Sequence, residues 1–273
     1  MSVPHQNSLC GSLAAHPGIQ AAVSTRVVTM AREEAGWVLG TRRSDAKSGE
    51  LAVAGPFSGL IVSDKQAASQ FATRQFGELP LMDSSAAIPE AVRGIGRQMQ
   101  GVGQEPRFVL MLAAQRPPGR PAPPAILDGP PGSIIVRLVR DSAKPGRKAG
   151  PLDCWVVTSS AAFAQEMIGS QGMTKLGTST HAELLEAVAD LLAKEAGRIL
   201  GPELGDVVYR VAHRWGACFP GGHSADRCMA DPVSVFAACG DYCGAPHGSV
   251  EAAVLSGMAA ADVLAAALPR SKV

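Results

Sequence analysis

The apolar positions of this chain fall into short runs through its first part and into longer helical repeats afterwards. Six of the short runs are bounded by glycine, proline or charged clusters and carry strand-forming residues, which is the pattern of strands. They are Arg26–Met30, Trp37–Gly40, Leu60–Ser63, Phe108–Ala113, Ile134–Val139 and Cys154–Ser159. Because proline cannot donate to a ladder and glycine weakens one, Arg116–Pro124 and Asp141–Pro151 are expected to be loops.

Helical spacing appears in the second part of the chain. Ala161–Ile168 is a short candidate, and apolar residues recur at helical spacing from Thr180 to Leu200, before Gly201-Pro202. Thr180 and Glu183 have the spacing of a capping box, which predicts the start of this helix. The expected closing elements are a strand at Val207–Trp215, a buried strand at Val233–Cys239 and a helix at Ser249–Leu268. The mixture predicts an α/β fold with an α+β lobe, built as two interleaved lobes.

Composition narrows the classes of partner. The 273 residues include 25 Lys and Arg and 24 Asp and Glu, so the formal net charge is +1. Such a balance argues against nucleic acid or an anionic membrane as partner, and 46% hydrophobic residues exclude a disordered chain. The longest apolar stretch, Ala252–Leu268, is short and contains Asp262, so no membrane span is expected. Met1–Gly18 resembles no secretory signal, so the six cysteines are expected to be free thiols in a soluble intracellular protein.

The most informative stretch reads as a strand, a turn and a helix between Val233 and Ala261. Gly240 permits a sharp turn and a close approach to a ligand, and Asp241 at the end of the strand can accept hydrogen bonds from a sugar or polyol hydroxyl. The helix that begins at Ser249 would present free N–H groups to a phosphate or a polarised carbonyl. From spacing alone, a tight turn and a capped core helix explain the same residues.

Histidine and cysteine residues near this stretch raise the alternative of a zinc site. Cys239 and Cys243 have the spacing of paired zinc ligands, but Cys218 and Cys228 do not form a second pair, so no metal is expected. The set also includes His213, His223 and His247. His213 and Trp215 are explained equally well as core residues on one strand face, and Arg214 on the other face as an ion-pair partner.

A family resemblance favours the cofactor-binding interpretation of these residues over the purely structural one. Cys239-Gly240-Asp241-Tyr242-Cys243, followed by Val250–Ala253 and Leu255–Ala260, resembles the C-terminal flavin motif of FAD-dependent amine oxidoreductases. More narrowly, it is similar to the renalase-like FAD/NAD(P)-binding oxidoreductases of plants and algae, in which the compartment would be cytoplasm or plastid. Supporting matches lie at Asn7–Cys10, Thr25–Met30, Ser63–Lys65, Lys144–Arg147, His213–Gly216 and Phe219-Pro220.

The resemblance implies roles for individual residues. Asp241 would bind the ribityl or pyrophosphate part of FAD, with Gly240 allowing its approach, and Val27 would contact adenine through its backbone. Val250 and Glu251 would lie beside the isoalloxazine ring. On the strand that borders the substrate pocket, the candidates are His213 as a pocket-lining catalytic group, with Arg214 and Trp215. The implied reaction is hydride transfer from a small reduced substrate, a dihydronicotinamide such as NAD(P)H or an amine, to the flavin.

The chain departs from the family at its front. Members open with a strand, a G-x-G-x-x-G turn and a helix that bind the ADP half of the cofactor, whereas this sequence begins about where that unit ends. Gly94–Met99 lacks the third glycine. The implied division is part of an FAD lobe at 1–65, mainly a substrate lobe with an antiparallel sheet at 66–215, and the closing FAD strand and helix at 216–273. The alternative is a truncated, cofactor-free remnant that serves at most as a binding or interaction module.

Overall fold

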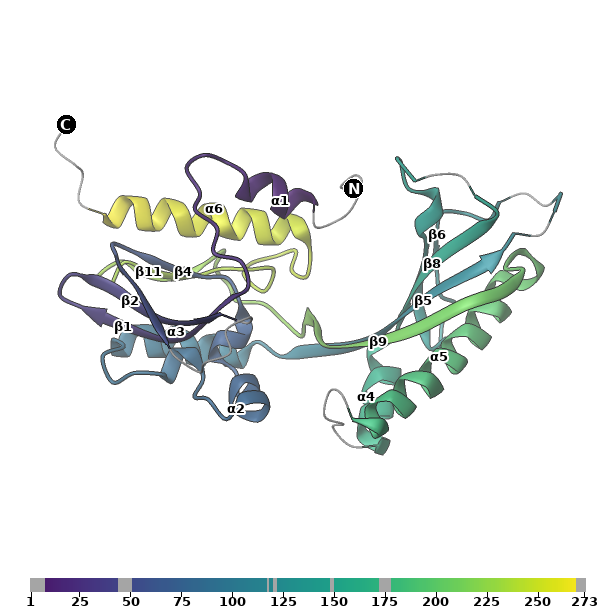
Figure 1. Ribbon diagram of the computed structural model, residues 1–273, viewed down its shortest axis with the longest axis horizontal. Coiled ribbons are helices and arrows are strands. Elements are labelled where there is room, and N and C mark those ends of the chain that lie inside the picture. The colour runs from purple at the N-terminus through teal and green to yellow at the C-terminus, as the bar shows by residue number, and fades with distance from the viewer. Residues whose placement is uncertain are drawn as a thin grey trace. The chain divides into compact units, whose positions relative to one another are not determined.

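The computed structural model of the protein describes residues 8–43, 51–116, 118–119, 122–147, 150–171 and 178–268. The chain forms two compact units, each built from two separate segments (Figure 1). Unit 1 combines Met1–Gln20 with Glu105–Cys218, and unit 2 combines Ala21–Gln104 with Phe219–Val273. Asn7, at the start of one family match, lies outside the described residues.

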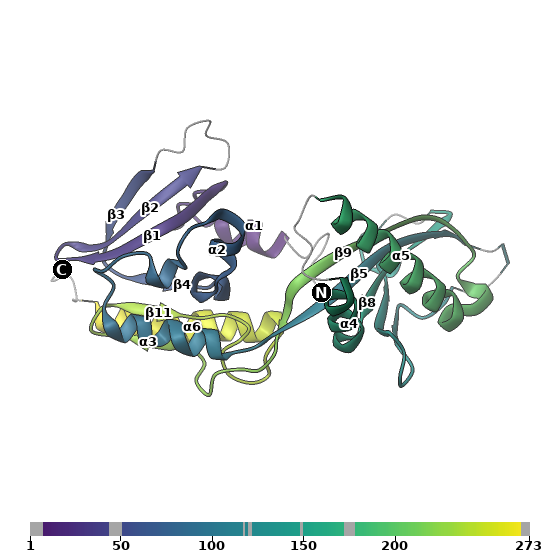
Figure 2. The same ribbon diagram turned by 90° about the horizontal axis from the view of Figure 1, so that it is seen from below.

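Unit 2 is layered around a small sheet in the order β10-β11-β4. Its strands are β4 (Leu60–Val62), β10 (Met229–Asp231) and β11 (Phe236–Ala238), and β4 runs parallel to β11. Helix α6 (Val250–Ala267) lies on one face of the sheet and helix α3 (Glu90–Gly101) on the other (Figures 1 and 2). Alternate residues of β11 therefore enter two different cores, with Ala237 facing α6 and Phe236 facing α3.

A three-stranded antiparallel meander completes unit 2. It consists of β1 (Thr25–Glu33), β2 (Gly36–Arg43) and β3 (Ala52–Phe57) in that order. Trp37 anchors the meander to the sheet, because its ring lies 5.5 Å from that of Phe236 and its Nε1 donates to the Ser234 carbonyl at 2.8 Å. The short helices between the meander and α3 are η1 (Lys65–Ala68), α2 (Phe71–Phe76) and η2 (Leu81–Asp83).

The packing of α3 explains why the compact units differ from the division expected from the sequence. Val92, Ile95 and Met99 of α3 are buried in the same cluster as Trp37 and Phe236. Residues 66–104 consequently belong with the meander and the closing segment, and residues 1–20 belong with unit 1.

Unit 1 holds a five-stranded sheet in the order β6-β7-β8-β5-β9. Its strands are β5 (Gln104–Gln115), β6 (Ile126–Asp128), β7 (Ile135–Arg140), β8 (Leu152–Ser159) and β9 (Asp206–Pro220). The helices are α1 (Ser8–Ala14), α4 (Ala161–Gln171) and α5 (Ser179–Leu200), and the 3-10 turns are η3 (Asp141–Ala143) and η4 (Gly201–Glu203). Leu110 and Trp155 on the sheet pack with Leu184, Val188 and Leu192 of α5 to form the core.

Several sequence predictions are confirmed and two are wrong. All six early strands are present, and Ser249 caps α6 by accepting a hydrogen bond from the Ala252 amide at 3.0 Å. The cap of α5 is Thr178, whose hydroxyl accepts from the His181 amide, so Thr180 lies inside the first turn. The strand expected at Val233–Cys239 is only three residues long, because Val235 turns at a φ of 52°.

Helix α6 is also, among the described helices, the one that is long and apolar enough to cross a membrane by length and composition. A core helix passes the same test, and α6 buries Ala252, Ser256, Ala260 and Leu264. These four residues are 22% of the helix, so packing within unit 2 accounts for only part of its apolar character. The absence of a membrane span stays a prediction.

Candidate functional site

The carboxyl ends of the two parallel strands in unit 2 lie side by side. Cys239, just after β11, donates its amide to the Val62 carbonyl of β4 at 3.0 Å. The next residues along the two strands are Ser63-Asp64 after β4 and Gly240-Asp241 after β11. In sheets with parallel strands, ligands bind outside these carboxyl ends. This edge is therefore where the fold itself directs a search for a binding site.

Gly240 makes the turn that follows β11 possible. Its φ is 154°, and a Cβ at this position would collide with the Tyr242 ring, so a larger residue is excluded on both counts. The buried Gly240 amide donates to the Ser256 hydroxyl of α6 at 2.9 Å. The Asp241 carbonyl accepts from the Gly248 amide at 2.8 Å. These two bonds fix the turn against the first half of α6.

Charged side chains of both signs lie at this edge, Lys65 with Asp64 and Asp241. Burial lowers the pKa of Lys65, and the neighbouring Asp241 carboxylate acts in the opposite direction. The Lys65 ammonium also donates to the Gly103 carbonyl at 2.6 Å. Asp64 accepts from the Gln66 amide at 2.8 Å, so this carboxylate is the cap of η1. Burial raises the pKa of Tyr242, whose hydroxyl is enclosed without a hydrogen-bond partner among the described residues. Asp241 is thus a half-buried carboxylate beside the Lys65 ammonium at this edge.

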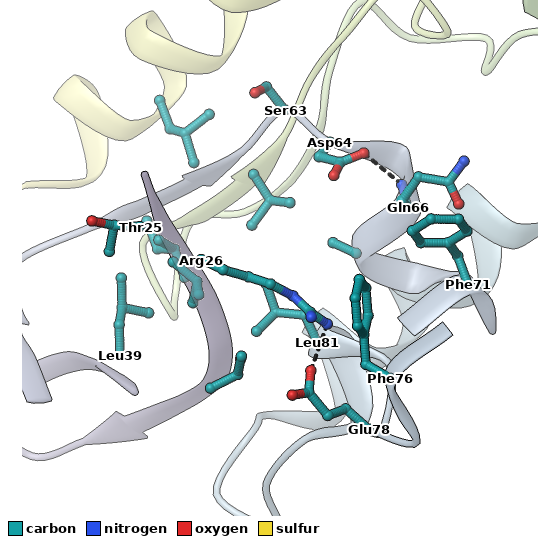
Figure 3. Close-up of a pocket in the computed structure, with 16 residues that line it drawn as sticks. Thr25, Arg26, Leu39, Ser63, Asp64, Gln66, Phe71, Phe76, Glu78 and Leu81 are labelled. Atoms are coloured by element: carbon teal, nitrogen blue, oxygen red, sulfur yellow. Dashed lines mark hydrogen bonds and ion pairs between the residues drawn. The ribbon is translucent and has the colours of Figure 1, made fainter. Parts of the chain in front are cut away.

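A pocket of about 600 Å³ opens beside β4 (Figure 3). One wall is the start of β1, including Val27, and another is β4 with Ser63 and Asp64. Its remaining lining comes from Leu39 of β2 and from the segment that runs from η1 to η2. The full lining is Thr25, Arg26, Val27, Val28, Leu39, Leu60, Ile61, Val62, Ser63, Asp64, Gln66, Ala67, Phe71, Phe76, Glu78 and Leu81.

An arginine, a carboxylate and an aromatic ring form a rigid group in this pocket. The Arg26 guanidinium lies 3.8 Å from the centre of the Phe76 ring and pairs with Glu78 at 2.5 Å. Arg42 binds the second Glu78 oxygen at 2.6 Å. Phe71 meets the Phe76 ring edge-on at 6.3 Å. A guanidinium stacked on an aromatic face and held by a carboxylate is preorganised to meet a planar or anionic ligand.

The other sequence-derived candidates lie elsewhere. Val250 and Glu251 are exposed in the first turn of α6. His213 and Trp215 belong to β9 of unit 1, where their rings meet edge-on at 4.6 Å and both side chains are exposed. Arg214, on the opposite face of β9, is half-buried. Burial lowers the pKa of His181, and the charges of Arg214 and His213 act in the same direction. The structure therefore places Val27 and Gly240-Asp241 in unit 2, after or within strands of two different sheets, and His213, Arg214 and Trp215 in unit 1.

Sequence reasoning missed the group formed by Arg26, Phe76 and Glu78. Arg26 lies in a predicted strand, and its two partners are some fifty residues further on, a separation at which no local pattern connects them. The zinc alternative concerns the histidines and cysteines near the closing strand and helix. Within the described ranges, no group of three or more histidine, cysteine or acidic side chains is placed to hold a metal ion.

Several solved structures have a fold similar to that of this chain. No family model matches the sequence, and no curated protein matches it. Among solved structures, a triple mutant of putrescine oxidase made to redesign cofactor binding is similar, with a TM-score of 0.57 at 14% identity. An oxidoreductase from Methanosarcina mazei gives 0.52 at 12%, and a proposed protoporphyrinogen oxidase from Exiguobacterium sp. 255-15 gives 0.53 at 8%.

These matches cover 96%, 87% and 89% of this chain, respectively. They cover 52%, 49% and 47% of the three solved chains, so the protein spans about half the length of each. At such low identity the likeness shows the fold alone. The fold is similar to that of these solved oxidoreductases over about half of their length, and the flavin-dependent, renalase-like and plant assignments belong to the proposal below.

Proposed function

We propose that this protein is the part of an FAD-dependent oxidoreductase that holds the adenosine and ribityl portions of the cofactor. The proposal rests on the closeness of two features in unit 2. The carboxyl ends of β4 and β11 lie together, and the pocket of about 600 Å³ opens beside the end of β4 with Val27 in its wall.

The described residues fit these portions of FAD. The apolar pocket walls suit an adenine ring, which Val27 would meet through its backbone. Asp241 follows β11 and is not part of the pocket lining, and it would offer an acceptor to a hydroxyl of the ribityl or pyrophosphate portion. The cap of α6 uses the Ala252 amide, which leaves the amides of Val250 and Glu251 in the exposed first turn. The sequence contains no G-x-G-x-x-G turn for the pyrophosphate. The fit therefore covers part of the cofactor.

The finer assignments follow from the family resemblance. The bound flavin would supply the hydride acceptor, and the substrate would be a small amine or a dihydronicotinamide such as NAD(P)H. The group formed by His213, Arg214 and Trp215 would line the substrate side through β9. The exposed imidazole and indole of His213 and Trp215 offer a polar and an aromatic contact to such a molecule.

One observation favours a second candidate, a cofactor-free binding module. Within the described sheet of unit 2, β4 pairs only with β11, so its other edge is unpaired and faces the pocket through Ile61. Unpaired edges of parallel strands are uncommon in isolated folds, because such sheets are normally buried. The pocket bounded by the unpaired edge of β4 would then serve as an interaction surface and not as a cofactor site.

FAD retention separates the two candidates. Purified protein is mixed with FAD, passed through gel filtration and tested for flavin absorbance that co-elutes with the chain. We expect retention, competition by ADP, and about tenfold weaker binding in Asp241→Asn, because a hydrogen bond to a charged acceptor contributes about 1.5 kcal/mol.

The control for this experiment is Asp262→Asn, the same change at an exposed position of α6. It should bind FAD as the unchanged chain does. A folded, monodisperse chain that elutes without flavin contradicts the proposal and leaves the binding module. Equal loss in both variants would contradict the role of Asp241 alone.

A further inference from the structure

Two cysteines flank the end of the β10–β11 ladder, Cys228 just before β10 and Cys239 just after β11. The antiparallel register pairs Met229 with Ala238 and Ala230 with Ala237. Extending it by one residue places Cys228 directly across from Cys239. Both side chains belong to the cluster that packs under α6, with Ala260 and Leu264, so they lie on the same face of the sheet.

The hydrogen bonds of β11 show which kind of pair this is. The Cys239 amide donates to Val62 of β4, and the Val235 carbonyl accepts from Leu60 of β4. The odd-numbered residues of β11 therefore direct their backbone groups toward β4 and away from β10. A ladder continued regularly to Cys228 and Cys239 makes them a non-hydrogen-bonded pair, and in such pairs the two Cα atoms are about 4.5 Å apart. This separation lies within the range of about 4.4–6.8 Å that a disulfide spans.

A third thiol lies close to this pair. Cys243 contributes to the raised pKa values of both Cys228 and Cys239. The Ser224 and Ser256 hydroxyls hydrogen-bond to Cys243 and act to lower its pKa, while burial raises it. Burial dominates at all three sites, so the thiols are protonated at neutral pH and react slowly. Cys228 is the half-exposed member, and the other two are buried.

We propose that Cys228 and Cys239 are a site of oxidative modification that closes to an intramolecular disulfide when the protein meets hydrogen peroxide. The Cys228 sulfur attacks the peroxide, whose O–O bond breaks to give a sulfenic acid and one water. The Cys239 sulfur then displaces the sulfenic oxygen, which leaves as a second water after both thiol protons are transferred. Two thiols and one peroxide thus yield one disulfide and two waters. The link joins β10 to β11 immediately before Gly240, and it does not depend on the proposed cofactor.

The chain offers a direct way to map the link. A protease that cleaves before aspartate releases Asp226–Ala230, Asp231–Gly240 and Asp241–Ala261, each with one of the three cysteines. The full chain is treated with hydrogen peroxide while folded, its remaining thiols are blocked, and the digest is analysed by mass spectrometry. We expect the first two peptides to be joined and to separate on reduction.

Variants give the matched controls. The link should disappear in Cys228→Ser and persist in Cys243→Ser, while Cys10→Ser and Cys154→Ser remove the two exposed thiols without affecting it. A main product that joins Asp241–Ala261 to either other peptide, or sulfinic acid on Cys228 without any link, overturns the proposal. Full recovery of free thiols from the folded, unchanged chain does so as well, and that measurement needs no variant to fold.

Discussion

Replacing Ser256 by alanine tests the bond that ties the Asp241 turn to α6. Ser256 is fully buried, and its hydroxyl accepts the buried Gly240 amide at 2.9 Å. The alanine variant leaves this amide enclosed without a partner. A buried donor left unsatisfied costs about 1–3 kcal/mol. Alanine is the better helix former by about 0.5 kcal/mol. The net expectation is that unit 2 loses about 1–2 kcal/mol of unfolding free energy.

The assay has to report on unit 2 alone, because two compact units can unfold separately. Trp37 is the single tryptophan of unit 2, since Trp155 and Trp215 lie in unit 1. In a background with Trp155→Phe and Trp215→Phe, urea unfolding followed by fluorescence measures unit 2. Hydrogen exchange of the peptide containing Gly240 gives the local readout, and its amide should lose protection.

The matched control is Ser170→Ala, the same change at an exposed position of α4 in unit 1. It should leave the Trp37 transition unchanged. A Ser256→Ala variant that unfolds within about 0.5 kcal/mol of the background, with the Gly240 amide still protected, would refute the reasoning. In that case, the turn after β11 is held by Gly240 geometry and the Gly248 bond alone.

Three further outcomes concern unit 1. Asp153→Asn should destabilise it by about 3 kcal/mol in urea unfolding, because the buried Asp153 carboxylate is paired with Arg116 at 2.6 Å. Hydrogen bonding to Arg116 lowers the pKa of Asp153, and Arg198 with Ser133 lowers the pKa of Glu195 to about 2. The unfolding free energy that these two carboxylates contribute to unit 1 is complete above the ordinary carboxyl pKa values. It should be lost as pH falls below those values. In Glu195→Gln the measured loss of unfolding free energy at low pH should be smaller. Burial lowers the pKa of His181, so unfolding free energy measured from pH 8 downward should begin to fall near pH 6.5, and His181→Leu should flatten this slope.

The sequence predicted elements whose signals are local. Strands such as Phe108–Ala113 follow from β-branched and aromatic runs, and Ser249 was recognisable as a cap because it precedes a long alanine-rich repeat. The cap of α5 was placed two residues late, because Thr178 and Thr180 are both suitable residues and the helix boundary decides between them. Local chemistry therefore located the elements and left their ends uncertain by about two residues.

Helix α3 shows what local patterns miss. Its glycines at positions 94, 96 and 101 argue against a helix on propensity. Gly96 has a tertiary reason, because a Cβ there would meet the Cβ of Met82 at 3.1 Å, so the glycine allows η2 to approach the helix closely. The helix is consequently stable through packing on the sheet, which no single-sequence pattern reports.

The candidate site also has one part that a local sequence motif predicts and one part that it misses. Gly240 and Asp241 were identified from a short motif, and their turn is fixed by bonds that lie within twenty residues of them. The Arg26, Phe76 and Glu78 group depends on contacts across fifty residues and became visible only in the folded pocket. Binding pockets assembled from distant segments are specified by the packing of the whole unit.

Ser256 connects the two proposals for unit 2. Its hydroxyl accepts the Gly240 amide of the turn that carries Asp241, and it also hydrogen-bonds to Cys243, which lies beside the Cys228 and Cys239 pair. A ligand that orders this turn therefore also restrains the segment that follows Cys239 and holds it opposite Cys228. Because coupling between two sites is reciprocal, any factor by which the disulfide changes FAD affinity must equal the factor by which FAD changes the equilibrium of disulfide formation. Comparing FAD retention by reduced and peroxide-treated protein measures that factor, and equal retention would show that the turn and the thiols act independently.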